Sequence, residues 1–187
     1  MFEYRFEIAY ASTYHPQFDL WGHLKKDFPS VKNMQIRRVF YVACQTQPQK
    51  EKLDSVLQEI LLDPLTETFI QRSEDDRKHL SKVFPESDGE SLLTMDVTYK
   101  PGVTDNTAHA LKEALTLADI SSCFVASGAL TIVDAPQTLH ENLQSWFCKN
   151  SFNPLIQQAR FCLSSKRESY FTSPLWESMG KLTQQES

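Results

Sequence analysis

The stretch LLDPLTETFI, residues 61–70, has a counterpart in KNSFNPLIQQARFCL, residues 149–163. The tripeptides DPL (63–65) and NPL (153–155) lie 90 positions apart. The residue before a proline is pushed out of the α region, so each tripeptide predicts the end of a helix. A strand is expected directly afterwards in both places. The chain is therefore predicted to contain the same helix–turn–strand unit twice.

The same separation of 90 positions matches apolar residues earlier in each half. Phe40 falls on Leu130, and Val42 falls on Ile132. The helix before each turn adds the pairs Leu53 with Leu143 and Leu57 with Phe147. Matches in one order at one separation indicate an internal duplication.

Each half opens with a strand in which apolar residues alternate with polar ones. The alternating residues are Tyr4, Phe6 and Ile8 in the first half and Leu93, Met95, Val97 and Tyr99 in the second. These two strands align only after a shift of one residue. An amphipathic helix follows in each half, with an apolar stripe of Phe18, Trp21, Leu24 and Phe28, then of Ala108, Leu111, Leu115 and Ala118.

Each half is then expected to contain two short strands, within about 31–43 in the first half and about 121–133 in the second. Ser127-Gly128 is expected to break the second of these segments. The second helix of each half begins after a T-x-x-[QE] pattern, at 46–49 and at 138–141. This pattern predicts a capping box, in which the threonine side chain bonds a free amide of the first turn.

The expected fold class is therefore α+β, with two tandem ferredoxin-like βαββαβ units packed as an internal pseudo-dimer. The first unit spans residues 1–71 and the second spans 92–164. Residues 72–91, RSEDDRKHLSKVFPESDGES, are charged and polar and predict a linker. Residues 165–187 lose the periodicity and are expected to be a tail or the start of a further linker.

Composition limits the classes of function. The net charge is -5 with no basic cluster, so we expect no nucleic-acid surface. The N-terminus lacks a signal-peptide pattern, and no apolar run is long enough to span a membrane. The four cysteines form no CxxC pair, which indicates reduced thiols in a cytoplasmic protein, and neither a disulfide framework nor a metal site is expected.

No catalytic motif stands out. The five histidines show no HxxxH or HExxH spacing, and no G-x-S-x-G elbow is present. We therefore expect no catalytic, cofactor-binding or metal-binding residue in this chain, although a cysteine and a histidine brought together by the fold stay a minor alternative.

The stretch YKPGVTDNTAHALKEAL, residues 99–115, joins a strand to a helix through a Pro-Gly turn. Such a turn can hold a phosphate, but a lone Gly102 followed by the acidic Asp105 argues against an anion. We expect instead that Asp105 or Thr104 caps the helix and that Lys100 is solvated.

The same stretch resembles PurS, the small-subunit family of phosphoribosylformylglycinamidine synthase. The family pattern is a strand, K-x-G-V-x-D-(P/N), a helix and a closing NP-x-I. Lys100, Gly102, Val103, Asp105 and Asn106 fit its first part, and Asn153, Pro154 and Ile156 fit its last. The double arrangement is similar to fused forms in which PurS-like units accompany the synthetase.

The resemblance implies a non-catalytic role in purine biosynthesis. PurS-like units bridge the glutaminase to the ATP-using synthetase and help ammonia pass between them. The chain itself would bind no cofactor, while ATP, magnesium and glutamine would be used by the parent ligase. The expected partners are the synthetase and glutaminase, with possible self-association. Partner contact is predicted at Lys100, Pro101, Gly102, Val103, Thr104 and Asp105.

A second hypothesis is a ligand-sensing regulatory module built from paired ferredoxin-like units, with the ligand between the units. Nucleic-acid binding on the sheet would need exposed aromatic residues on central strands. Phe40 and Tyr41 are adjacent and are expected on opposite faces of their strand, which weakens that reading.

Overall fold

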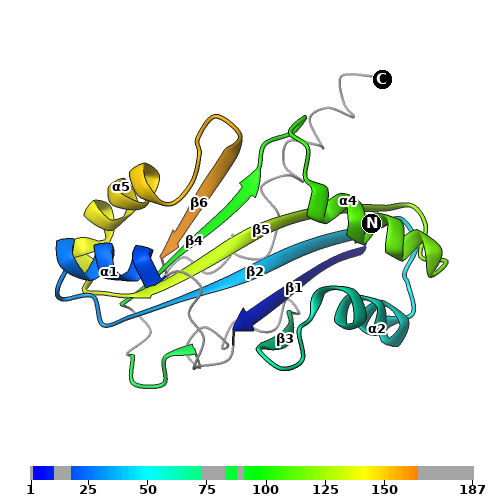
Figure 1. The fold of residues 1–187 in the computed structure, drawn as a ribbon, viewed down its shortest axis with the longest axis horizontal. Coiled ribbons are helices and arrows are strands. Elements are labelled where there is room, and N and C mark those ends of the chain that lie inside the picture. Colours follow the sequence, from blue (N-terminus) through cyan, green and yellow to red (C-terminus); the bar gives the residue numbers. More distant parts are fainter. Residues whose placement is uncertain (1, 11–17, 73–82, 88–90, 164–187) are drawn as a thin grey trace.

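The structure is a computed structural model that describes residues 2–10, 18–72, 83–87 and 91–163 (Figure 1). Within these residues the fold is α+β, with one six-stranded antiparallel sheet and four α-helices. The strands are β1 (Phe2–Tyr10), β2 (Asn33–Cys44), β3 (Glu67–Arg72), β4 (Leu92–Tyr99), β5 (Cys123–Asp134) and β6 (Gln157–Leu163). Their order across the sheet is β3-β1-β2-β5-β4-β6, so each half of the chain fills one side.

The long strands β2 and β5 join the two halves. They pair antiparallel along their whole length, from Asn33 opposite Asp134 to Cys44 opposite Cys123. Strand β1 pairs with the free side of β2, and β4 pairs with the free side of β5. Strands β3 and β6 pair with β1 and β4 and form the two edges. One sheet therefore runs through both halves, and its centre lies at the β2–β5 pair.

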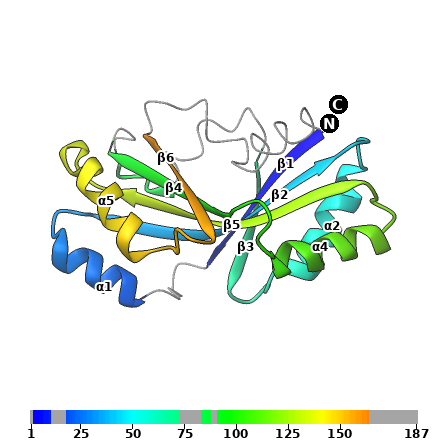
Figure 2. The same cartoon turned by 90° about the horizontal axis from the view of Figure 1, so that it is seen from above.

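All four helices lie on one face of this sheet (Figure 2). They are α1 (Phe18–Asp27), α2 (Lys50–Leu61), α4 (Asn106–Leu117) and α5 (His140–Asn150). Helix α2 of the first half packs beside α4 of the second, and α1 lies beside α5 (Figure 1). Each helix pair thus combines one helix from each half.

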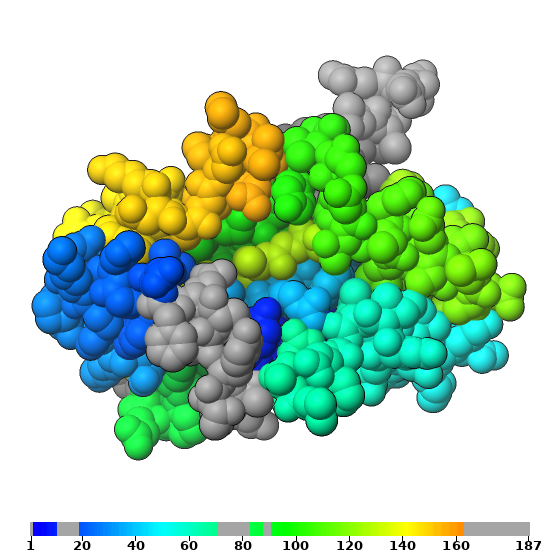
Figure 3. All heavy atoms as spheres, viewed as in Figure 1, coloured from blue at the N-terminus to red at the C-terminus, as the bar shows by residue number. Residues whose placement is uncertain are grey.

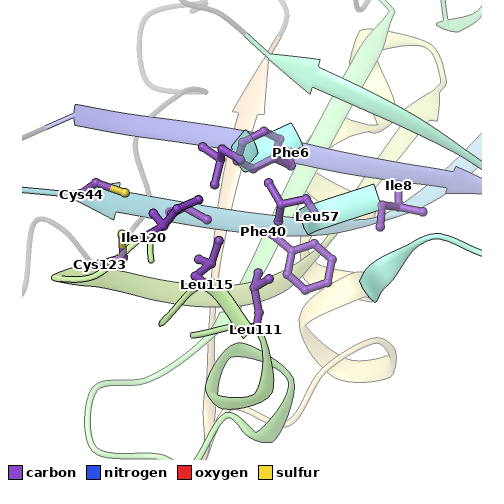
Figure 4. Close-up of a cluster of buried hydrophobic side chains, with 11 residues drawn as sticks. Phe6, Ile8, Phe40, Cys44, Leu57, Leu111, Leu115, Ile120 and Cys123 are labelled. Atoms are coloured by element: carbon purple, nitrogen blue, oxygen red, sulfur yellow. The ribbon is translucent and has the colours of Figure 1, made fainter. Parts of the chain in front are cut away.

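The α2–α4 pair covers a core on the first-half side of the sheet (Figure 4). Phe6 of β1 and Phe40 of β2 pack there against Leu57 of α2 and Leu111 of α4, and all four are buried. Alternate residues of a strand point to one face, which is why every second residue of β1 is apolar. The helical stripe at 108, 111 and 115 supplies the other side of this core.

The α1–α5 pair covers a second core over the second half of the sheet. Leu24 of α1, Met95 of β4 and Phe147 of α5 are all buried in it. The indole nitrogen of Trp146 donates a hydrogen bond to Asp27 Oδ2 at 2.7 Å, which ties α5 to the end of α1. The first-half helix is therefore held over strands of the second half.

The opposite face of the sheet carries a smaller apolar cluster. Val39, Tyr41 and Leu130 are buried there, with Val83 and Phe84 packed against them. Val83 and Phe84 of the predicted linker 72–91 thus pack on the sheet, and Arg72 of the same segment is the last residue of β3. Residues 73–82 and 88–90 of that linker, and the predicted tail 165–187, lie outside the described residues.

The expected pair of short strands in each half is wrong. β2 and β5 are each one continuous strand of 12 residues, so the order in each half is βαβαβ and not βαββαβ. Ser127-Gly128 does not break β5. Glycine is required there because a Cβ at position 128 would lie 2.3 Å from the Val97 carbonyl oxygen of the neighbouring strand.

The two predicted capping boxes are also wrong. Helix α2 begins after Gln49 and α5 after Leu139, and neither N-cap side chain makes a capping hydrogen bond. Thr138 instead lies in a 3₁₀ turn, Gln137–Leu139, that leads into α5. This turn satisfies its backbone amides locally, so the threonine is not needed as a cap.

The predicted match of Phe40 with Leu130 and of Val42 with Ile132 is wrong as well. Phe40 and Val42 lie on the helix-bearing face, whereas Leu130 and Ile132 lie on the opposite face. Successive residues of a strand point to opposite faces of the sheet. Residues of β2 and β5 that share a face are an odd number of positions apart, so a separation of 90 cannot relate the two strands.

Candidate functional site

The turn at 100–105, which the sequence predicts to contact a partner, follows β4 directly. Gly102 has φ +82°, a left-handed conformation that favours glycine, and the Val103 amide donates to the Lys100 carbonyl at 3.1 Å. Lys100 Nζ donates to the Pro154 carbonyl at 2.6 Å. The structure thus places this turn beside the NPL turn of the same half, and Pro101, Gly102 and Thr104 are exposed.

Asp105 is the N-cap of α4, one of the two residues that the sequence offers for this role. Its Oδ1 accepts a hydrogen bond from the Ala108 amide at 2.9 Å. It also accepts two bonds from Ser127 of β5, from the amide to Oδ2 and from the hydroxyl to Oδ1, both at 2.8 Å. Both carboxylate oxygens are therefore engaged within the chain, and Asp105 positions α4 on β5.

The DPL and NPL turns have the same hydrogen bonds. Oδ1 of Asp63 accepts from the Leu65 amide at 3.0 Å, and Oδ1 of Asn153 accepts from the Leu155 amide at 3.0 Å. These are Asx turns, in which a short polar side chain fixes the backbone two residues on. The two leucines are 89% and 82% exposed, so each turn presents one leucine to solvent.

A second bond repeats two residues further along. Glu67 Oε2 accepts from the Asp63 amide at 2.9 Å, and Gln157 Oε1 accepts from the Asn153 amide at 2.9 Å. The first residue of each edge strand therefore closes the turn that precedes it.

A cleft opens on the helix-bearing face between the two helix pairs. Figure 3 looks into it, with β2 and β5 visible at the bottom of the hollow. Its volume is about 220 Å³. The lining includes Arg38, Phe40, Val97, Tyr99, Ser127 and Gln157.

Arg38 is the charged residue in the lining of this cleft. Its Nη2 donates to the Leu61 carbonyl at 2.6 Å and to the carboxylate of Glu67 at 2.7 and 2.8 Å. The guanidinium also lies over the ring of Phe40, with 6.0 Å to the centroid. The arginine is thus held in place, with its side chain 36% exposed.

The opposite face carries a buried ionic network. Glu7 accepts from Arg5 Nε at 3.0 Å through one oxygen and from Arg37 Nη1 at 2.8 Å through the other. Arg5 Nη1 reaches Asp96 Oδ2 of β4 at 2.8 Å. The Tyr41 hydroxyl accepts from Arg5 Nη1 at 2.5 Å and donates to the same oxygen of Asp96. This network connects strands of both halves.

The environment of two further groups fixes their protonation. Burial, followed by the Asp96 carboxylate, raises the pKa of the Tyr41 hydroxyl well above its ordinary value of 10. Burial, followed by a hydrogen bond with Cys123, raises the pKa of the Cys44 thiol to about 12. A thiol with so high a pKa is a poor nucleophile at neutral pH.

Among the described residues, the structure brings few chemically reactive groups together. Cys44 and Cys123 face each other across β2 and β5, both buried and both free thiols. His140 bonds backbone carbonyls, and His109 pairs with Glu113 at 3.3 Å on an exposed helix face. Among the described residues no group of three or more His, Cys, Asp or Glu side chains could hold a metal ion. Phe40 and Tyr41 lie on opposite faces, as predicted, and both are buried.

Sequence reasoning missed Arg38 and Gln157. One signal was present: in β2 the apolar residues Met34, Ile36 and Phe40 occupy alternate positions, and Arg38 falls in the same series. An arginine in an apolar series marks either a buried ion pair or a site. Gln157 carried no comparable signal, because its position follows from the turn that precedes it.

Within the part of the chain that the structure describes, no helix is long and apolar enough to cross a membrane. Comparisons with known proteins assign no family: no family model matches the chain, and no curated protein matches it.

Proposed function

We propose that the chain is a duplicated PurS-like unit that acts as a non-catalytic assembly module. The duplication is the first part of the proposal. Equivalent elements follow in the same order in each half, βαβαβ, and the sheet order is the same from each edge inward. The matching Asx turns at 63–65 and 153–155 support it most directly.

The register of the sheet supports the same relation. We match the edge strands β3 and β6 at a separation of 90 positions. The pairing registers then match β1 with β4 at 89 positions, as in Phe6 with Met95, and β2 with β5 at 91 positions, as in Arg38 with Ala129. The shift between β1 and β4 is the one that the sequence predicts. Arg38 and Ala129 face each other directly on β2 and β5. A pseudo-twofold axis would pass through this pair.

This arrangement is the intramolecular form of a dimer. Two such units as separate chains would meet through β2 and would have to pair at their working concentration. Within one chain the effective concentration of the second unit is high. Each half has three strands where a ferredoxin-like unit has four, with one long strand in place of the expected pair.

The second part of the proposal is the role. The chain would bridge the glutaminase and the synthetase of phosphoribosylformylglycinamidine synthase and support ammonia transfer between them. ATP, magnesium and glutamine would bind those components and not this chain. The observation that carries the proposal is that one sheet presents two matching turns, each with an exposed leucine. In the second half the 100–105 turn lies beside this leucine turn, through the bond from Lys100 to Pro154.

Reconstitution tests the role. The purified chain is added to a synthetase–glutaminase pair that lacks its PurS-like component, and glutamine-dependent amidine formation is measured. We expect no turnover by the chain alone and restored turnover by the mixture. A chain that neither binds these partners nor raises their glutamine-dependent rate would contradict the proposal.

A further inference from the structure

The cleft at the centre of the sheet lies where the two halves differ in side chains. In the first half Arg38 and Glu67 form an ion pair, with the guanidinium also bonded to the Leu61 carbonyl. The corresponding residues of the second half are Ala129 and Gln157. Gln157 keeps the bond to the turn that Glu67 makes, but the arginine side chain has no counterpart. Most of the residues that line the cleft belong to this second half.

The missing arginine has a physical reason. Arg38 and Ala129 are directly opposite on neighbouring antiparallel strands, so two arginines here would be cross-strand neighbours. Like charges directly opposite each other destabilise a sheet. One half therefore carries the arginine, and the other half keeps a space of about 220 Å³.

The lining of this space offers hydrogen-bond donors. Among the described residues, Arg38 Nη2 makes all the hydrogen bonds of this side chain, which is 36% exposed, so Nη1 stays available as a donor. Gln157 uses its side-chain oxygen for the turn, which leaves its amide nitrogen as a donor. Phe40, Val97 and Ala129 add apolar surface to the same cleft. Ligand pockets commonly combine such apolar walls with a few polar groups.

We propose that this cleft binds a small molecule with one carboxylate and an apolar body. The carboxylate is held by Arg38, and the body lies against Phe40, Val97 and Ala129. Glu67 neutralises much of the arginine charge, so binding is modest. An engineered cavity of about 150 Å³ holds benzene, so the present space suits a molecule of about ten non-hydrogen atoms. This binding site is separate from the assembly role.

The test uses the full chain labelled with ¹⁵N and the probe 3-phenylpropionate. We expect amide chemical shifts to change with saturation at residues 97–99 and 127–129, with Kd of about 0.1 to 1 mM. The neutral analogue 3-phenylpropionamide is the chemical control, and we expect it to bind at least tenfold more weakly.

Two variants keep the test independent of folding. Ala129→Leu fills the cleft without adding charge and is expected to abolish the shift changes at 97–99. Arg38→Met with Glu67→Gln removes the cation and its partner together, so no buried carboxylate is left unpaired, and is expected to weaken binding at least tenfold. Both variants should keep the dispersed spectrum of the parent chain.

Three results would overturn the proposal: no shift changes with the probe, equal binding of the amide, or changes that persist in folded Ala129→Leu. Each is distinct from failure of the assembly role, since reconstitution does not use the probe.

Discussion

The two halves of the molecule share a backbone plan but differ in the side chains near its centre. The turns at 63–65 and 153–155 have the same Asx hydrogen bonds and the same exposed leucine. At the β2–β5 pair, in contrast, Arg38 faces Ala129. The comparison teaches that the same turn can form at two places far apart, whereas two residues directly opposite on neighbouring strands must suit each other. Two arginines at this pair would repel.

The largest expected effect concerns Glu7 and Asp96, which the proposed duplication relates at 89 positions and which lie on the face of the sheet away from the helices. Both are buried, and Arg5 bonds to both of them. Asp96→Ala leaves Arg5 short of one buried partner, and we expect the free energy of unfolding to fall by about 3–5 kcal/mol. Chemical denaturation measures it, with exposed Glu59→Ala as the matched control, expected to change stability by less than about 0.5 kcal/mol. A loss for Asp96→Ala no larger than that of the control would show that this network does not tie the halves together.

The next effect concerns Gly128, whose first-half counterpart is the buried Arg37. A Cβ at 128 would meet the Val97 carbonyl oxygen at 2.3 Å, so Gly128→Ala should cost about 1–3 kcal/mol. Gly22 in α1 has open space around its Cβ position, so Gly22→Ala should be neutral or stabilise by up to about 1 kcal/mol. Thermal unfolding should therefore occur at a lower temperature in Gly128→Ala and at an unchanged or higher temperature in Gly22→Ala, and an equal loss in both variants would contradict the close approach of β4 and β5.

A smaller loss of stability is expected at Asp105, the N-cap of α4. Asp105 caps α4 and accepts two bonds from Ser127, one from its amide and one from its hydroxyl, whereas the counterpart of Ser127 in the first half is Ile36, which has no hydroxyl to donate. We expect Asp105→Ala to cost about 1–2 kcal/mol and Asp105→Asn, which keeps a capping oxygen, to cost less. Hydrogen exchange of the α4 amides is the readout. Unchanged exchange in the alanine variant would mean that the cap contributes nothing.

The last effect concerns the Cys44 thiol of the first half. Its influence on the free energy of unfolding is the smallest of the four at neutral pH and grows at alkaline pH. The Cys44 thiol has a pKa raised to about 12 by burial and Cys123, while its counterpart in the second half is Ala135. Because the unfolded chain loses this proton near pH 9, folding is favoured below that pH and loses stability progressively between pH 9 and 12. Denaturation at pH 8 and 10.5 should show a decline that is reduced in Cys44→Ala. An identical decline in that variant would assign the effect to other groups, such as Tyr41.

Local features of the fold could be predicted from the sequence. The alternation in β1 and β4, the stripe in α4, the turns at the two prolines and the cap by Asp105 all depend on residues close together in the chain. The continuity of β2 and β5 could not, because Gly128 looks like a strand breaker until the neighbouring carbonyl is known.

The cleft could not be predicted for a related reason. A single separation of 90 positions fits the turns but places Phe40 and Leu130 on the same face, which the register of β2 and β5 forbids. Only the register places Arg38 opposite Ala129, and the residues that line the cleft come from strands that are distant in the sequence. The buried network of Arg5, Glu7 and Asp96 likewise depends on contacts between distant strands.

The measurement that tests the account most directly compares the two leucine turns during reconstitution. Glutamine-dependent turnover of a synthetase–glutaminase pair is followed with the parent chain, with Leu155→Ser combined with Lys100→Glu, and with Leu65→Ser. The altered residues are exposed or partly exposed, so all three chains should fold. We predict that the second-half variant loses at least tenfold in activation while Leu65→Ser keeps most of it. Full activation by the second-half variant, or no activation by the parent chain, would contradict the account.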